Sequence, residues 1–397
     1  MPPSLAALIA RALPEVVALR HDLHAHPEIA YQEHRTSKLI TRELTALGIA
    51  HAPGLAGGTG VVAHLPASTD AGNALPAVGL RADSDALPLV VQTGLPYASS
   101  TPGRMHACGH DGHTAILLGV ARVLKDLPRP RPVTLVFQPA EEGGGGGERL
   151  CNEGLLDGAI IGPRIEKMFG LHGWPELPVG TVGTRAGPLL ASTDELRATI
   201  VGVGSHAAYP HHGRDPILAM SQCIVALQTL VSRGVSPTDS VVLSVCIVKG
   251  GSASNVIPDS ATFTATLRCL EASSRKFAHQ RASEIIQATA SAGGCTAELN
   301  WQEGYPVTYN DPALTARFFT LADAWLGPAN VVRVPHPSMG GEDFSYYAQR
   351  VPSVFFCLGL KCAGQARTPM LHQPDFDFND QAIPLGIEVF CRLATEA

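Results

Sequence analysis

The sequence lacks the features that indicate a nucleic-acid or membrane protein. Its 29 lysine and arginine residues are outnumbered by 35 aspartate and glutamate residues, which gives a net charge of −6 without any basic cluster. Such a surface does not attract nucleic acid. No apolar run approaches the ~20 residues that span a bilayer, and charged residues interrupt the N-terminal segment where a signal peptide needs an apolar stretch. We therefore expect a cytoplasmic protein with no nucleic-acid or membrane partner.

The sequence also lacks a disulfide framework, because its nine cysteines follow no framework spacing. Five of them lie within apolar stretches: Cys223, Cys246, Cys269, Cys357 and Cys391. We expect these five to be reduced, buried thiols, which agrees with a cytoplasmic location.

The order of the expected elements predicts two domains, for which 397 residues are enough. In residues 1–187 and 301–397, apolar strand-like runs alternate with helical patterns. This alternation indicates an α/β catalytic domain with a mostly parallel sheet flanked by helices. In residues 188–300 the order is β-α-β-β-α-β, which is typical of a ferredoxin-like α+β unit. We therefore expect this second unit to be inserted into the first domain.

One nine-residue segment, Met105–His113, is rich in side chains that bind metals. It reads MHACGHDGH and leads directly into a helical pattern, so its side chains would lie at the mouth of a helix. The spacing of Cys108 and His110 lets a thiolate and an imidazole approach one ion, and this ligand set suits zinc or a similar transition metal. The alternative is a buried thiol beside solvated histidines.

Two adjacent carboxylates, Glu141 and Glu142, follow a predicted strand. They would point in different directions, so one can bind a metal ion while the other takes a proton from water. The alternative is a solvated acidic turn. The pair of Asp83 and Asp85, and also His172, follow predicted strands too, and the carboxyl ends of parallel strands are where chemistry occurs in such sheets.

Two separate histidines, His172 and His372, complete a candidate ligand set. With Cys108, His110 and Glu142 they make five ligands of mixed nitrogen, oxygen and sulfur type. Five ligands are more than the four that close a structural zinc site, but they suit two ions sharing a bridging water.

Eight motifs are spread over nearly the whole chain: RHDLHAHPE (20–28), RADSDALP (81–88), MHACGHDGH (105–113), QPAEEG (138–143), GSHAAYPHHGRDP (204–216), NVIPD (255–259), MGGEDF (339–344) and LHQPDFDFND (371–380). In this order they are similar to the motifs of the M20 family of metallopeptidases and amidohydrolases. The resemblance is to the branch that contains hippurate hydrolases, N-acyl-amino-acid amidohydrolases and indole-3-acetyl-amino-acid hydrolases.

The resemblance implies roles for residues of the first domain. It implies that two divalent ions (Zn, Mn, Co or Ni) are held by Cys108, His110, Glu142, His172 and His372. It places the general base on Glu141. It also implies that Asp85 orients a metal ligand from behind, while Asp83 would be a turn or salt-bridge carboxylate.

The resemblance also implies roles for residues at or near the inserted unit. His206 matches a histidine that in relatives reaches the partner subunit's site and helps to stabilise the oxyanion. Asn255 and Arg268 match positions that hold the substrate's carboxylate, and Gly341 lies in a loop that lines this pocket. The alternatives are turn residues at His206 and Asn255 and a surface ion pair at Arg268.

The implied function is a metal-dependent amidohydrolase that cleaves a small N-acyl amino acid, hippurate-like or N-acetylated, to a carboxylic acid and a free amino acid. The implied assembly is a homodimer through the inserted domain, or a tetramer. Three alternatives stay open. The same site could serve a dipeptidase, the scaffold could be a non-catalytic binding protein, or Cys108 could be the nucleophile of a metal-free hydrolase.

Overall fold

The structure, a computed structural model, describes residues 4–364 and 367–397, which form two compact units. The first unit comprises the chain up to Leu189, Tyr309–His336 and Asp343–Ala397. The second comprises Leu190–Thr308 and Pro337–Glu342. The second unit thus includes residues 301–308 and 337–342, which the sequence prediction placed in the catalytic domain. The catalytic and dimerising roles of the two units stay predictions.

The first unit is built on an eight-stranded sheet whose central strands are parallel. In spatial order its strands are β1 (Ala50–Leu55), β2 (Gly60–Leu65), β4 (Val133–Gln138), β3 (Ala77–Asp83), β5 (Ile165–Pro178), β16 (Ser353–Lys361), β6 (Val182–Thr184) and β15 (Val331–Arg333). The strands β3 and β4 are buried along their whole length. This confirms the predicted α/β fold class.

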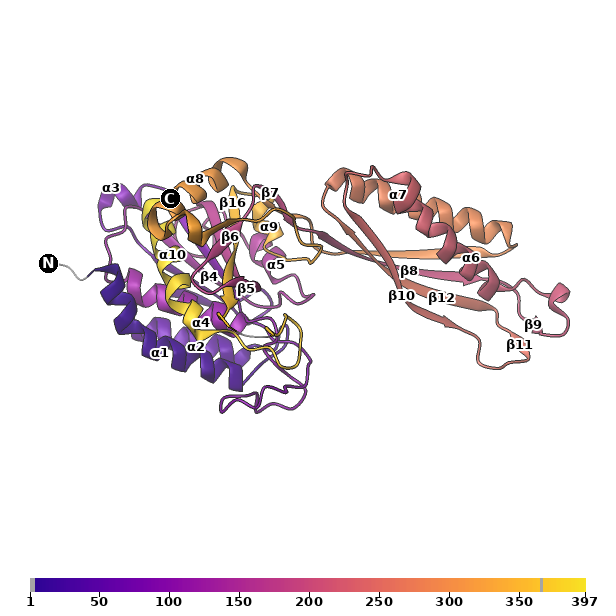
Figure 1. Ribbon diagram of the computed structural model, residues 1–397, viewed down its shortest axis with the longest axis horizontal. Helices are drawn as coiled ribbons and strands as arrows, with labels where there is room; N and C mark the ends of the chain where they lie inside the picture. The colour runs from indigo at the N-terminus through magenta and orange to yellow at the C-terminus, as the bar shows by residue number, and fades with distance from the viewer. Residues whose placement is uncertain (1–3, 365–366) are drawn as a thin grey trace. The chain divides into compact units, whose positions relative to one another are not determined.

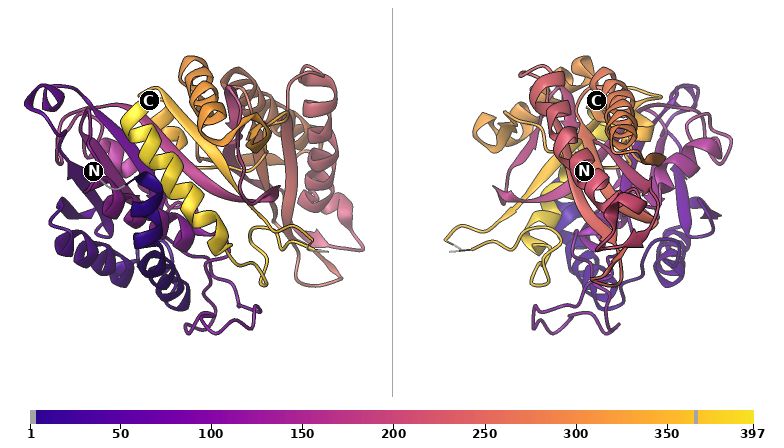
Figure 2. Two further views of the ribbon diagram at one scale, coloured as in Figure 1. Left: turned by 60° about the vertical axis from the view of Figure 1, so that its left-hand side comes forward. Right: turned by 90° about the vertical axis from the view of Figure 1, so that its right-hand side faces the viewer.

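Helices cover both faces of this sheet (Figures 1 and 2). They are α1 (Leu5–Ala25), α2 (His34–Ala46), α3 (Asp70–Asn73), α4 (His110–Leu124), α5 (Gly146–Asn152), α8 (Pro312–Leu326), α9 (Ser345–Ala348) and α10 (Ile383–Glu396). On one face, Phe356 of β16 lies 5.3 Å from Phe318 of α8 and 5.7 Å from Phe390 of α10, measured between ring centroids. Phe355, which precedes Phe356 in β16, points to the other face of the sheet. There it contacts Phe344, which lies just before α9.

Helix α4 begins within the MHACGHDGH motif, where two glycines allow a close approach of the chain. Gly109 caps the helix with a φ of 86°, a left-handed conformation that favours glycine. A Cβ on Gly112 would lie 2.5 Å from Cγ of Phe378, so only glycine fits against this buried ring. The body of α4 is buried and packs against α1 and α10. His110 and its neighbours are therefore anchored in the core.

The second unit has the predicted ferredoxin-like order β-α-β-β-α-β. Its elements are β8 (Ser192–Val201), α6 (Pro216–Thr229), β10 (Val241–Gly250), β12 (Ser260–Cys269), α7 (Ala272–Ala292) and β13 (Thr296–Glu303). The sheet is antiparallel, in the order β10-β12-β8-β13, and α6 and α7 pack on it. A short hairpin of β9 (Ser205–His206) and β11 (Val256–Ile257) extends from it. A ribbon of β7 (Gly187–Leu190) and β14 (Thr308–Asn310) forms where the chain passes between the units.

Two sequence expectations are corrected in the second unit. Cys246 is exposed and lies at the bulge where the pairing of β10 with β12 shifts register, whereas the other four cysteines expected to be buried are buried. The segment Pro216–Gly234 is 19 residues long with a mean hydropathy of 1.3, so among the described residues one helix is long and apolar enough to cross a membrane. A single such helix is weak evidence, and its inward residues, including Cys223 and Leu227, lie in the core of the unit.

Candidate metal centre

The structure brings together all five side chains that the sequence predicts as metal ligands. Cys108, His110 and His172 offer ligand atoms within 4.8 Å of one another. Cys108, Glu142 and His372 form a second group of this kind, and the two groups share the thiol. The four segments that carry these residues lie far apart in the sequence, and the sheet and α4 bring them to one place. The ligand roles themselves stay predictions.

The Cys108 thiol lies at the centre of the cluster. Its Sγ lies 3.3 Å from Nε2 of His172 and 3.3 Å from Nε2 of His372. Nε2 of His372 also lies 3.2 Å from Oε1 of Glu142. Nδ1 of His172 donates to the carbonyl oxygen of Gly173 at 2.8 Å, which leaves the lone pair of Nε2 directed at the cluster.

His110 is oriented by the backbone and side chain of Asp85. Its Nδ1 lies 2.9 Å from the carbonyl oxygen and 3.3 Å from Oδ1 of Asp85. Its Nε2 is buried without a hydrogen-bond partner among the described residues, which is the arrangement of a metal-binding imidazole. Asp85 also accepts hydrogen bonds from the backbone N–H groups of Glu141 and Glu142, at 3.0 and 2.9 Å. One carboxylate thus positions three of the residues at the centre.

A buried ion-pair network lies behind the cluster, and of its members the sequence analysis considered only Asp83. Asp83 accepts from Nη1 of Arg81 at 2.7 Å and lies 2.6 Å from Nδ1 of His113. Nε2 of His113 accepts the N–H of Gly173 at 2.8 Å. Both ring nitrogens of His113 are therefore used, so this third histidine of the motif is not free to bind a metal. The salt-bridge role that the sequence offered for Asp83 is what the structure shows. The sequence did indicate the ion pair between Arg81 and Asp83, because residues two apart in a strand lie on the same face.

The charges around Cys108 favour a bound cation. Burial, together with Glu142 and Glu141, raises the pKa of this thiol well above its ordinary value. A thiolate forms here only when a positive charge is bound next to it. The same surroundings disfavour a metal-free nucleophile, since a reactive cysteine needs a lowered pKa.

The imidazoles of the cluster also suit a cation. Burial and the nearby ring of His113 lower the pKa of His172 well below its ordinary value, so this ring is neutral and can donate a lone pair. Burial by itself lowers the pKa of His110, but Asp83 and Asp85 together raise it to about 10, so without a metal this ring holds a proton that a bound cation would displace. The pocket therefore attracts positive charge, and its donor set of sulfur, nitrogen and oxygen fits transition-metal ions.

Glu141 and Glu142 lie in a tight turn after β4. The turn begins at Ala140, which has a φ of 57°, a conformation uncommon for a residue with a side chain. The buried carboxylate of Glu33 accepts the N–H of Ala140 at 2.9 Å and the hydroxyl of Thr59 at 2.8 Å. Burial and the charge of Asp85 raise the pKa of Glu33 to about 7. Glu33 therefore holds this turn, a role that the sequence analysis did not predict.

The predicted substrate residues of the second unit fall into two pairs. His206 is exposed in the β9–β11 hairpin, and the carbonyl oxygen of Asn255 accepts the N–H of its neighbour Ala207 at 3.0 Å. Gly341 lies beside Arg268, since a Cβ at Gly341 would lie 3.2 Å from Nη1 of that arginine. Strand β12 begins at Ser260, shortly after the hairpin strand β11. Arg268 lies eight residues further along β12, a distance of about 26 Å in a strand. The structure does not bring the two pairs together within one copy of the unit.

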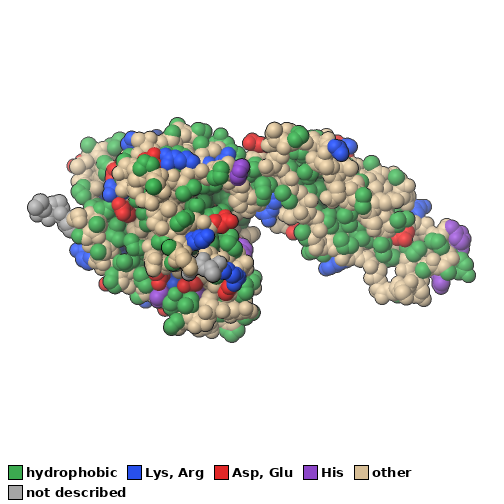
Figure 3. All heavy atoms as spheres, in the orientation of Figure 1, with side chains coloured by type: hydrophobic (Ala, Val, Ile, Leu, Met, Phe, Trp, Pro, Cys, Tyr) green, Lys and Arg blue, Asp and Glu red, His purple; other side chains and the backbone are tan. Residues whose placement is uncertain are grey.

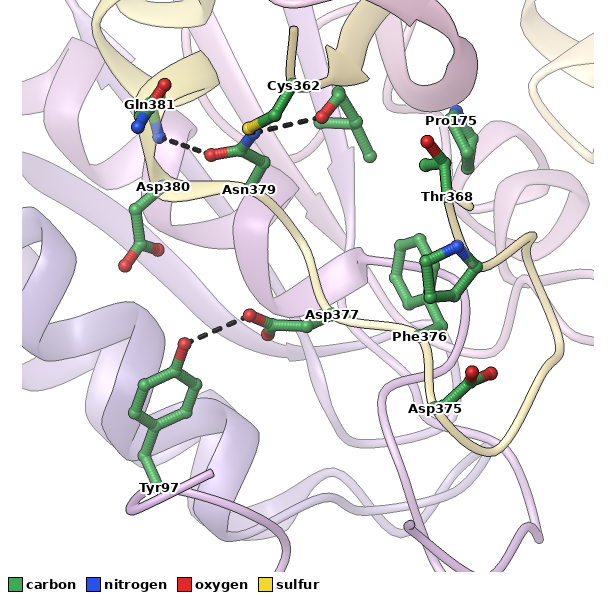
Figure 4. Close-up of a pocket in the computed structure, with 12 residues that line it drawn as sticks. Tyr97, Pro175, Cys362, Thr368, Asp375, Phe376, Asp377, Asn379, Asp380 and Gln381 are labelled. Atoms are coloured by element: carbon green, nitrogen blue, oxygen red, sulfur yellow. Dashed lines mark hydrogen bonds between the residues drawn. The ribbon is translucent and has the colours of Figure 1, made fainter. Parts of the chain in front are cut away.

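A cavity of about 430 Å³ lies elsewhere in the first unit (Figure 4). Its lining residues include Tyr97, Pro175, Cys362, Asp377 and Asp380. None of the five predicted ligands lines it. The metal cluster is therefore identified by its donor atoms and not by this cavity.

Comparison with known proteins identifies a matching family model and several relatives. A family model described as peptidase family M20/M25/M40 matches residues 79–396. The chain is 41% identical to IAA-amino acid hydrolase ILR1-like 4 of Arabidopsis thaliana, over 96% of this chain and 85% of the relative. It is 40% identical to N-acetyl-L-cysteine deacetylase of Bacillus subtilis (strain 168), over 93% and 85%.

A solved structure, that of the YXEP protein of Bacillus subtilis, is described as a dinuclear metal binding peptidase from the M20 family. It matches with a TM-score of 0.83 and 33% identity, over 97% of this chain and 98% of that one. The family model covers most of the chain, and the relatives cover nearly all of it. The chain therefore belongs to peptidase family M20/M25/M40 and is a metal-dependent hydrolase of its amidohydrolase branch.

Proposed function

We propose that this enzyme cleaves the amide bond of N-acyl amino acids and releases a carboxylic acid and a free amino acid. Two relatives, an IAA-amino acid hydrolase and an N-acetyl-L-cysteine deacetylase, support this substrate class by their names. The observation that carries the proposal is the pair of ligand groups sharing Cys108, with a separate carboxylate, Glu141, beside them. Two divalent ions (Zn, Mn, Co or Ni) would supply Lewis acidity for the amide carbonyl and a lowered pKa for water.

Glu141 is the proposed general base. It is buried, with 6% of its surface exposed, and its backbone N–H is held by Asp85. A carboxylate oxygen of Glu141, a ring nitrogen of His110 and a carboxylate oxygen of Glu142 form one group of potential ligand atoms within 4.8 Å of one another. Glu142 lies 3.2 Å from His372 and takes the ligand role, which leaves Glu141 to accept the proton of the attacking water. Glu141 then passes this proton to the leaving amine.

Arg268 is the proposed partner of the substrate's carboxylate. It is half-buried, its Nε donates to Oγ1 of Thr266 at 3.2 Å, and burial lowers its pKa. A half-buried guanidinium favours a bound anion. Gly341 packs closely beside it, since a Cβ there would lie 2.1 Å from Cγ2 of Thr193. The guanidinium suits the carboxylate that every N-acyl amino acid carries.

His206 and Asn255 are proposed to act on the site of a partner subunit, as the resemblance implies. Nδ1 of His206 accepts the N–H of Ala208 at 3.1 Å, so Nε2 carries the proton and can donate to an oxyanion. The proposal is supported by the separation of this hairpin from Arg268 along β12. A second copy of the chain is needed to bring both ends of the sheet to one substrate.

The proposed assembly is a homodimer through the second unit. Exposed apolar side chains are present on β10 and α6, the edge strand and one helix of that unit, and Figure 3 shows apolar surface there. They include Leu218, Val225, Val242, Ile247 and Val248. An exposed apolar edge of this kind is typical of an association surface. We propose a cytoplasmic enzyme with no nucleic-acid or membrane partner.

The test is a substrate panel assayed with metal-stripped and metal-restored enzyme. Hippurate and N-acetyl amino acids are expected to be cleaved only after Zn, Mn, Co or Ni is restored. Dipeptides with free N-termini are the comparison, because they carry a positive charge where the acyl group has none. Cleavage of dipeptides alone would indicate a dipeptidase, and no cleavage of any member would favour a binding protein.

A further inference from the structure

Arg20, on α1, is an arginine with no exposed surface that contacts three carboxylates. Its Nε donates to Oδ2 of Asp111 at 2.9 Å, and its Nη1 donates to Oδ1 of Asp380 at 3.1 Å. Its Nη2 donates to Oδ1 of Asp377. Burial alone would lower the pKa of Arg20, but the three carboxylates raise it above its ordinary value, so the charge is permanent. One side chain thus joins two remote segments of the chain.

Each of the two segments carries proposed metal ligands. Asp111 is the residue after His110, in the first turn of α4. Asp377 and Asp380 lie five and eight residues after His372. Arg20 itself is not a ligand. It therefore connects the half of the centre that contains Cys108 and His110 to the half that contains His372.

The segment that carries His372 needs to be held. His372 has a φ of 61°, which is uncommon for a residue with a side chain, and such a conformation persists only when its surroundings fix it. Its N–H donates to the carbonyl oxygen of Ala107 at 2.8 Å. Further along, Phe378 packs on Gly112, the carbonyl oxygen of Pro374 accepts the N–H of Gln92 at 2.7 Å, and Nδ2 of Asn379 donates to the carbonyl oxygen of Leu360 at 2.9 Å. Arg20 adds the ion pairs that tie this segment to the start of α4.

Tyr97 strengthens the same connection. Its hydroxyl donates to Oδ2 of Asp377 at 3.0 Å, an interaction drawn in Figure 4, where Asp380 lies nearby. The guanidinium carbon of Arg20 lies 5.0 Å from the centre of the Tyr97 ring, which is cation–π distance. His21 stacks on the Tyr97 ring, with the ring centroids 3.7 Å apart, and its Nε2 lies 2.7 Å from Oδ2 of Asp380. Both oxygens of Asp377 are thereby occupied.

We propose that Arg20 is a positioning residue that sets the place of His372 relative to Cys108 and His110, and so determines how tightly one of the two metal ions is held. This inference rests on the proposed ligand roles. The planar guanidinium makes it specific to arginine, because its three nitrogens face three carboxylates in fixed directions. A lysine keeps the charge but is a single point that cannot hold both segments at their present separation.

The experiment measures the affinity of the full-length enzyme for each of two zinc equivalents, by competition with a chromophoric chelator. The variants are Arg20→Lys and Asp377→Asn, where the second has a side chain that is 27% exposed and carries little risk of misfolding. We expect both to weaken one equivalent about 10- to 100-fold, as the loss of outer-shell partners does, and to leave the other within about threefold. The matched control is Asp375→Asn, on the same segment, whose carboxylate pairs with Arg367 instead. It should bind zinc like the wild type.

His372→Ala is the reference variant, because it removes the proposed ligand and should weaken the same equivalent. If His372→Ala binds both equivalents like the wild type, the proposed ligand set is wrong, and the inference falls with it. If His372→Ala loses one equivalent while Arg20→Lys and Asp377→Asn keep both, the ligand set stands and the positioning role is overturned. Equal weakening of both equivalents, or a lower unfolding temperature with unchanged zinc binding, would also overturn it.

Discussion

Replacing Asp85 by Asn changes one atom and leaves the shape of the side chain unchanged. Oδ2 of Asp85 accepts the N–H of Glu142 at 2.9 Å. Oδ1 accepts the N–H of Glu141 at 3.0 Å and lies 3.3 Å from Nδ1 of His110. An asparagine has only one oxygen, so its NH₂ group must face a backbone N–H, donor against donor. At least one charge-assisted hydrogen bond is lost.

The magnitude follows from that lost bond. A hydrogen bond to a charged group contributes about 1.5–3 kcal/mol, which corresponds to about a 10- to 100-fold change in an equilibrium constant. We expect metal affinity of Asp85→Asn to fall by this factor, because the bond orients Glu142 and His110. Turnover at saturating metal should fall as well, because Glu141 is held by the same carboxylate.

The assay is a zinc titration of stripped enzyme, followed by kcat and KM at saturating zinc. Asp323→Asn is the control, since that carboxylate pairs with Arg333 at the surface, far from the centre in the sequence, and its loss should cost no more than about 1 kcal/mol of stability. Wild-type metal affinity and kcat in Asp85→Asn would refute the reasoning that this carboxylate positions the centre.

Three further predictions follow from the site. Glu141→Ala should abolish turnover and retain metal near the wild-type content, measured by elemental analysis; full activity would remove the proposed base. His206→Ala should lower kcat by about 100-fold, in the range of a lost oxyanion donor, with unchanged metal content, and an unchanged kcat would dismiss that role. The raised pKa of Glu33, about 7 against an ordinary 4.5, favours the folded state below pH 4.5, and this contribution is lost as the pH rises through 7. Relative to Glu33→Gln, the wild type should therefore lose up to about 1.4 kcal/mol of stability per pH unit across that range, and equal pH profiles of chemical unfolding would contradict this.

The helices and the buried strands could be predicted from the sequence because their apolar patterns are strong. The predicted strand at 133–138 coincides with β4, and the ferredoxin-like order of the second unit is confirmed. The short strands β6 and β15, at one end of the sheet, were missed because three residues carry no readable period. Helix α1 begins at Leu5, where Ser4 caps it, and Pro14 is accommodated inside the helix although proline normally interrupts one.

Three of the candidate ligands could be named from the sequence because Cys108 and His110 lie where a helix opens and Glu142 follows a strand, whereas His172 lies inside β5 and His372 in a turn. The structure places Cys108 and Glu142 together. The residues behind them could not be named, because their roles depend on partners remote in the sequence. Arg20 contacts Asp380, which is 360 residues away, and Glu33 contacts Ala140, which is 107 residues away. No local pattern carries such information.

The length of β12 has a consequence for mixtures of defective subunits. If the hairpin of His206 serves a neighbouring copy, a chain with Glu141→Ala can still lend its histidine, and a chain with His206→Ala can still lend its base. Random reassortment makes about half of all pairs mixed, and each mixed pair has one complete site. Two inert preparations, unfolded together and refolded, would then regain about a quarter of the original turnover.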